Sequence, residues 1–114
     1  MVGNDLIQEI KEKRKSLMDA VENMRYMGAK LAESEFKYKV ALRKEIFLLH
    51  EDKKVAWTAC SNLAHGEDSE FEVAQKRYNR DFAKTQYEAS QELINALKLE
   101  IRIIEGDLKR EWGM

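Results

Sequence analysis

Proline is absent from this sequence, which removes the residue most disruptive to helices. Proline lacks a backbone N–H and kinks or ends a helix, and it makes up roughly 5% of average proteins. Glycine is also scarce, with 5 residues in 114. Nothing in the composition therefore blocks long helices.

Cysteine occurs once, at Cys60, so the chain cannot close an internal disulfide. The opening stretch MVGNDLIQEIKEKRK has no uninterrupted apolar segment of the kind a secretion signal needs. The longest apolar run, IFLL, is far shorter than the ~18 residues of a membrane span. We therefore expect a cytoplasmic protein with no membrane contact.

The charge of the chain has no strong sign, because 20 basic and 21 acidic residues leave a formal net charge of −1. This balance excludes the global attraction to nucleic acid of a strongly basic domain, although a local basic face is still open. With 44% hydrophobic and 36% charged residues, the chain is too apolar to be disordered. We expect it to fold with extensive charged surfaces.

Seam positions spaced three and four residues apart predict a first helix over about residues 5–50. They are Leu6, Ile10, Leu17, Val21, Met24, Gly28, Leu31, Glu35, Tyr38, Leu42, Ile46 and Leu49. Such spacing is typical of a coiled-coil-type seam. Glu35, and Asp81 further on, fall in or beside the seams, where polar residues commonly fix the register between helices.

A second long helix is predicted over about residues 70–112, beginning at a capping box of Ser69 and Glu72. Its seam is expected at Phe71, Ala74, Tyr78, Phe82, Thr85, Ala89 and Leu93. Between the long helices, Val55, Ala59 and Leu63 recur every four residues and predict a short helix at about 54–64.

These elements predict an all-α fold: two long antiparallel helices in a coiled-coil-like hairpin, with a short helix at the connecting end, forming a single domain over residues 1–114. A turn centred near residue 60 would pair Glu35 with Thr85, Leu42 with Tyr78 and Leu17 with Ile103. Trp57 and Leu63 are expected to clasp the hairpin end near Leu49 and Phe71.

No residue pattern indicates catalysis. The stretches His50–Asp52 and His65–Asp68 match no zinc-ligand spacing, and Cys60 lies on a small apolar helix with no positioned histidine base. We therefore predict no catalytic, metal-binding or cofactor-binding residue and no enzymatic activity.

Two basic clusters are candidates for contact with nucleic acid or with a protein partner. They comprise Lys11, Lys13, Arg14 and Lys15 in KEKRK, and Arg77, Arg80 and Lys84 in RYNRDFAK. Basic residues interleaved with aromatic ones can bind phosphates and stack on bases. The alternative is a solvated helix face, since Arg77 to Asp81 and Lys84 to Glu88 have the spacing of intrahelical ion pairs.

The apolar face of the second helix widens after Ala89 to about half the circumference, more than one partner helix covers. Its proposed oligomer interface consists of Leu93, Ile94, Leu97, Ile101, Ile104, Leu108 and Trp112. The first helix adds an off-seam stripe of Met18, Met27, Phe36, Val40 and Phe47. Exposed patches of this size mark association surfaces, so the sequence predicts a homodimer.

The chain resembles a group of small uncharacterised helical proteins from phages and prophages of low-GC Gram-positive bacteria. The resemblance lies in AESEFKYKVALRKEIFLL, the NLAHGED turn, RYNRDFAKTQYEASQELINALKLEI and the REW near the end. Genes of that group often lie among replication and recombination genes. The resemblance implies an accessory protein of the host cell cytoplasm and supplies no catalytic residues.

Together, these features favour a non-enzymatic, dimeric helical interaction module that contacts a protein of phage DNA replication or recombination. Two alternatives stay open. The chain could bind nucleic acid directly through its basic helix faces, or it could inhibit a host enzyme or defence system.

Overall fold

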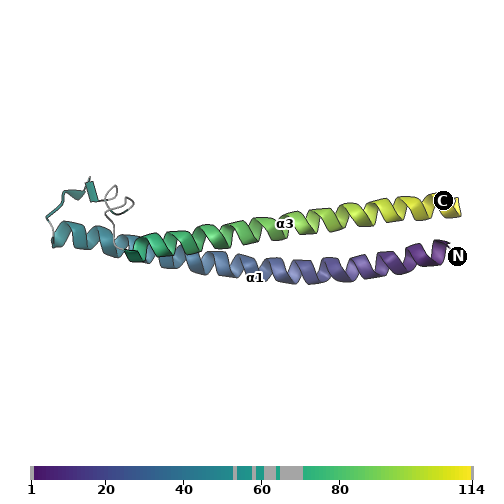
Figure 1. Ribbon diagram of the computed structural model, residues 1–114, viewed down its shortest axis with the longest axis horizontal. Helices are drawn as coiled ribbons and strands as arrows, with labels where there is room; N and C mark the ends of the chain where they lie inside the picture. Colours follow the sequence, from purple (N-terminus) through teal and green to yellow (C-terminus); the bar gives the residue numbers. More distant parts are fainter. Residues whose placement is uncertain (1, 53, 58, 61–63, 65–70, 114) are drawn as a thin grey trace. The chain divides into compact units, whose positions relative to one another are not determined.

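The computed structural model describes residues 2–52, 54–57, 59–60, 64 and 71–113. Two long helices dominate it: α1 spans Val2–Glu51 and α3 spans Phe71–Trp112 (Figure 1). No strand occurs within these residues. The two helices pack antiparallel, and the prediction of an all-α helical hairpin is confirmed.

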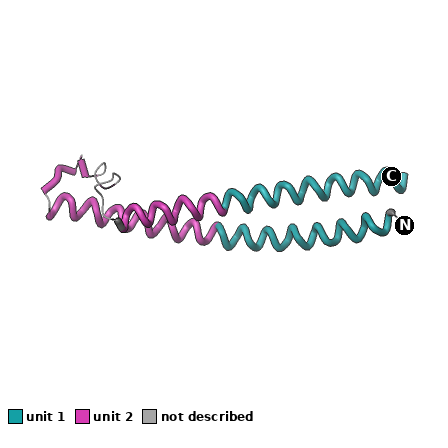
Figure 2. Tube along the Cα trace, in the orientation of Figure 1, with its two compact units in different colours: residues 1–27, 87–114 teal, residues 28–86 magenta. Residues whose placement is uncertain are grey.

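The chain divides into two compact units, shown in different colours in Figure 2. Unit 1 comprises residues 1–27 and 87–114, and so combines the first half of α1 with the second half of α3. Unit 2 comprises residues 28–86 and holds the remaining helix halves together with the connecting segment.

Unit 1 has an aliphatic core built by both helices. Ala20 of α1 packs with Ile94 and Leu97 of α3, and all three are buried. Leu17, Val21 and Met24 pack against this cluster, and Ile101 and Ile104 are also buried. Burial of each large aliphatic side chain is worth about 1.5–3 kcal/mol, so this unit is held mainly by the hydrophobic effect.

The ends of α1 and α3 meet in unit 1 through a glycine. A methyl group added at Gly3 would stand 2.8 Å from Cε2 of the Trp112 indole, closer than real Cβ contacts allow. Gly3 is buried although it has no side chain, because the indole lies directly against its backbone. The absence of a side chain at Gly3 allows this close approach, and a larger residue there would displace the indole.

In unit 2 the helices meet through a smaller and more polar set of side chains. Tyr38 and Ala41 of α1 pack with Val73 of α3. The guanidinium of Arg80 lies 4.5 Å from the centre of the Tyr38 ring, and Glu45 is only 5% exposed. Unit 2 therefore places charged groups in the seam where unit 1 places aliphatic ones.

The connecting segment returns along the end of α1. Lys54 adopts a left-handed conformation with φ of 59°, and the Val55 N–H donates to the Leu49 carbonyl over 3.0 Å. Cys60 and Ala64 are completely buried and pack with Leu49. Trp57, Ala59, Cys60 and Ala64 are helical, as the predicted short helix requires, whereas residues 54–56 are not.

The seam predicted for α1 is confirmed, since each of its positions from Leu6 to Leu49 is buried or half-buried. The seam predicted for α3 is wrong. One line of buried or half-buried positions instead runs along the whole helix with a seven-residue repeat: Val73, Lys76, Arg80, Ala83, Tyr87, Ser90, Ile94, Leu97, Ile101, Ile104 and Leu108. Of the predicted seam, Ala74, Tyr78, Phe82, Thr85, Ala89 and Leu93 are exposed.

The physical reason is that α3 is one continuous helix, so its buried face must keep the same phase along its whole length. A seam with a seven-residue repeat keeps facing its partner helix, and only the face through Val73 and Arg80 is in phase with the strongly aliphatic positions from Ile94 onward. The predicted helix pairing is wrong for the same reason. Leu17 packs with the Ala20–Ile94–Leu97 cluster, whereas Ile103 and Tyr78 are exposed.

Candidate functional site

Two of the four residues of the predicted basic cluster in α1 form ion pairs with α3 in unit 1. Lys13 forms an ion pair of 2.8 Å with Glu100, and Arg14 forms one of 3.3 Å with Glu105. The hydrogen bond from Lys13 to Glu100, together with the charge of that carboxylate, raises the pKa of Lys13. Lys11 and Lys15 are exposed. Half of this cluster therefore serves the contact between α1 and α3.

The predicted basic cluster of α3 lies in unit 2, and its central residue has two intramolecular partners. Arg80 pairs with Asp81 at 2.8 Å and stacks on the ring of Tyr38. Arg77 is half-buried and Lys84 is exposed. An arginine held by an aromatic ring and a carboxylate offers less of its charge to a phosphate.

The predicted oligomer interface requires a correction. Ile94, Leu97, Ile101 and Ile104 are buried inside the hairpin, where α1 covers them, so they cannot form a free surface. Leu108 is half-buried, while Leu93 and Trp112 are exposed. Leu99 and Ile103, which lie on the outward side of α3 in unit 1, are also more than half exposed. An uncovered apolar surface therefore exists on α3 in unit 1, but its residues differ from those of the predicted interface.

The predicted clasp also requires a correction. Trp57 is 53% exposed and stacks on His50 instead of filling the hairpin end, with ring centroids 3.6 Å apart and an interplanar angle of 15°. Leu63 and the side chain of Phe71 lie outside the described residues. Among the described residues of this end, Leu49, Cys60 and Ala64 are buried, and the small side chains of Cys60 and Ala64 pack against the end of α1.

Val55 organises the contacts around Trp57. Its carbonyl oxygen accepts a hydrogen bond from Nδ1 of His50 at 2.9 Å and another from the Cys60 thiol at 3.4 Å. The first bond orients the imidazole under the Trp57 indole, and the second holds the thiol inside the apolar cluster. Cys60 is thus a packing residue, as its small apolar surroundings in the sequence indicate.

The outward side of α1 in unit 2 carries basic residues that the sequence analysis did not include among its candidate sites. Phe36, Val40 and Phe47, three members of the predicted off-seam stripe, are exposed. Lys39, Arg43 and Lys44 are also exposed along the same stretch. The available signal was the interleaving of aromatic and basic letters in FKYKVALRKEIF.

The residues that the structure describes contain neither a metal-binding cluster nor a membrane-spanning helix. These residues bring together no group of three His, Cys, Asp or Glu side chains suited to a metal ion. Within the same residues, no helix is long and apolar enough to cross a membrane.

No family model matches this sequence, and no curated protein or solved structure matches it.

Proposed function

We propose that this chain is a non-enzymatic helical interaction module that pairs with a second copy of itself and contacts a protein of phage DNA replication or recombination. The support for pairing is structural, and it lies in the apolar side chains that unit 1 leaves uncovered. The support for the phage context is the sequence resemblance described above.

The single observation that favours pairing is the outward face of α3 in unit 1. Leu99 and Ile103 are 57% and 55% exposed, and the exposed Ala96 lies one turn before Leu99 on the same side. On an ideal helix these three positions fall within about 60° of one another, so they form one stripe. Each large aliphatic residue that moves from water into an interface contributes about 1.5–3 kcal/mol.

A second copy of the chain is a suitable occupant of this stripe, because a two-fold axis places the same apolar patch on both subunits. Two hairpins joined through α3 would form a four-helix arrangement in which the stripe covers its own copy. The buried isoleucines then stabilise each hairpin, and the outward residues join two hairpins.

Light scattering at micromolar concentration tests this proposal. We expect the parent protein to have twice the 13.4 kDa mass of one chain. A Leu99→Glu, Ile103→Lys double variant should have the mass of a monomer and keep a helical circular dichroism spectrum. Phe82→Glu is the matched control, because Phe82 is equally exposed on the same helix but lies in unit 2. A stable parent monomer of 13.4 kDa would disprove the pairing.

A further inference from the structure

The outward side of α1 in unit 2 forms a second helical seam. Its positions alternate spacings of four and three residues: Phe36, Val40, Arg43, Phe47 and His50. On an ideal helix these five positions span about 80°. Phe36 is 69% exposed, and Val40 and Phe47 are about half exposed. We call these five residues the α1 ridge.

The α1 ridge lies opposite the face that the hairpin itself uses. Tyr38, Ala41, Glu45 and Leu49 are buried, and on an ideal helix they point about 180° away from the ridge. In unit 2, α1 therefore has two faces with coiled-coil spacing. Its own hairpin covers one of them, and the ridge stays open to solvent.

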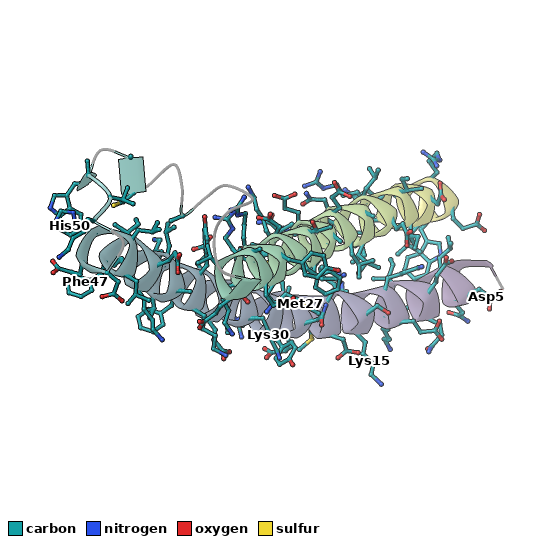
Figure 3. The ribbon with its side chains drawn as sticks, turned by 60° about the vertical axis from the view of Figure 1, so that its left-hand side comes forward. Asp5, Lys15, Met27, Lys30, Phe47 and His50 are labelled. Atoms are coloured by element: carbon teal, nitrogen blue, oxygen red, sulfur yellow. The ribbon has the colours of Figure 1, made fainter. Side chains whose placement is uncertain are left out.

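The connecting segment extends the ridge at the end of α1. Phe47 and His50 lie at the same end of the helix (Figure 3). The Trp57 indole stacks on the His50 imidazole, whose Nδ1 is held by the Val55 carbonyl. A large aromatic surface is thus fixed in position and still more than half exposed. Aromatic side chains of this kind are typical anchors of protein interfaces.

The exposed charges between the first and last residues of the α1 ridge are all basic, and the exposed acidic residues Glu33 and Glu51 lie just beyond its two ends. Lys39, Arg43 and Lys44 are exposed and make no ion pair with any carboxylate in the described part of the chain. Lys37 is exposed as well and pairs with Glu33. Glu45 is the one acidic residue between positions 36 and 50, and it is buried on the opposite face. The surface around the ridge is therefore both apolar and basic.

We propose that the α1 ridge, together with Trp57, is the docking site for an acidic amphipathic helix of a partner protein. The alternating spacing is the pattern along which a second helix packs its own side chains. The flanking cations select acidic residues beside the apolar face of that helix. The inference rests on the proposed interaction function and specifies its partner, whereas self-pairing uses the α3 stripe of unit 1.

The probe is a fluorescently labelled amphipathic peptide of about 20 residues, with leucines at alternating three- and four-residue spacing and glutamates beside them. A second peptide carries lysines in place of the glutamates. Fluorescence anisotropy with the full chain should show binding of the acidic peptide, weakening as salt is raised, and at least about tenfold weaker binding of the basic peptide.

Two variants locate the site on the ridge. Phe47→Ala should weaken binding of the acidic peptide by about tenfold or more, as loss of an aromatic anchor does. Lys39→Glu combined with Lys44→Glu should weaken it by a similar factor and reduce its salt dependence. Phe82→Ala is the matched control, since this exposed aromatic lies on α3 of the same unit, and it should leave the affinity unchanged.

Four results would overturn the proposal: no binding of the acidic peptide, equal binding of both peptides, binding unaffected by the ridge variants, or a single-stranded DNA 20-mer that displaces the peptide from the ridge. Light scattering of Phe47→Glu supplies a further check. If this variant were a monomer and the parent a dimer, the ridge would be a self-association surface instead. Loss of dimers only in the Leu99 and Ile103 variant would leave the docking proposal intact.

Discussion

Units 1 and 2 contain halves of the same two helices, yet they are held together by different chemistry. Unit 1 packs Ile94 and Leu97 of α3 around Ala20 of α1. At equivalent seam positions unit 2 has Arg80 over Tyr38 and a buried Glu45. Aliphatic packing stabilises without requiring particular orientations, whereas polar seam contacts form only in one alignment. We therefore expect the aliphatic core of unit 1 to contribute most of the stability, and the polar seam contacts of unit 2 to fix the register of the two helices.

The largest expected effect on stability comes from a substitution in the aliphatic core of unit 1. Ile94→Ala should lower the free energy of unfolding by about 2–5 kcal/mol, because it opens a cavity in the unit 1 core. Leu93→Ala, at the adjacent exposed position, should cost under about 1 kcal/mol. Urea denaturation at one fixed protein concentration measures both. Equal effects would contradict the burial assigned to Ile94.

Trp57→Ala should have an intermediate effect, a loss of about 1–2 kcal/mol of stability. The indole is 53% exposed, so only part of its surface is removed from water, and the stack on His50 adds a modest term. Thermal melting monitored by circular dichroism gives the value. A loss of 3 kcal/mol or more, which a fully buried tryptophan would give, would show that Trp57 is a core residue after all.

Arg80→Ala should remove about 1 kcal/mol, through loss of the Tyr38 stack and of the side-chain packing of its methylene groups. Its diagnostic effect is on alignment. Disulfide trapping between cysteines placed at positions 41 and 73, in a Cys60→Ala background, should be less efficient in the Arg80→Ala variant than in the parent. Unchanged trapping would mean that Arg80 does not contribute to register.

The smallest expected effect on stability comes from the ion pair between Lys13 and Glu100, a polar contact between α1 and α3 beside the aliphatic core of unit 1. The pKa of Lys13 is raised above its usual 10.5 by Glu100, so its stabilisation is present at neutral pH and is lost as the pH rises through the folded-state pKa. The urea midpoint of the parent should therefore fall between about pH 8 and about pH 11 by more than that of Lys13→Met. Identical pH responses would contradict this contribution.

Much of the fold was predictable because its signals are local. Absence of proline and persistent three- and four-residue spacing predicted two long helices, and α1 shows the seam that its apolar positions indicate. The face of α3 was not predictable in the same way. The aromatic residues Tyr78 and Phe82 give residues 71–93 an apparent seam by hydrophobicity, whereas the observed face runs through Arg80 and Ala83, which are less hydrophobic.

The sequence predicted that the candidate surfaces exist, but it did not predict which residues form them. Surplus apolar residues in residues 93–112 were recognised correctly, but their division into Ile94 inside and Leu99 outside depends on where α1 lies. Glu35 and Asp81 were both predicted to lie in or beside the seams. Glu35 is half-buried, Asp81 is exposed and pairs with Arg80, and the deeply buried carboxylate is Glu45. Side chains one or two positions apart differ by about 100–200° around a helix, so a small error in phase exchanges inside and outside.

The sequence by itself determined that this chain is helical, where α1 and α3 run and that it has more apolar residues than one helix pair buries. These properties follow from backbone propensity and periodicity, which each helix carries alone. The tertiary structure decided the phase of α3, the partners of Lys13 and Arg80, and the exposure of Trp57 and the α1 ridge. Burial is a property of two packed surfaces, so no helix specifies its inner face until its partner is in place.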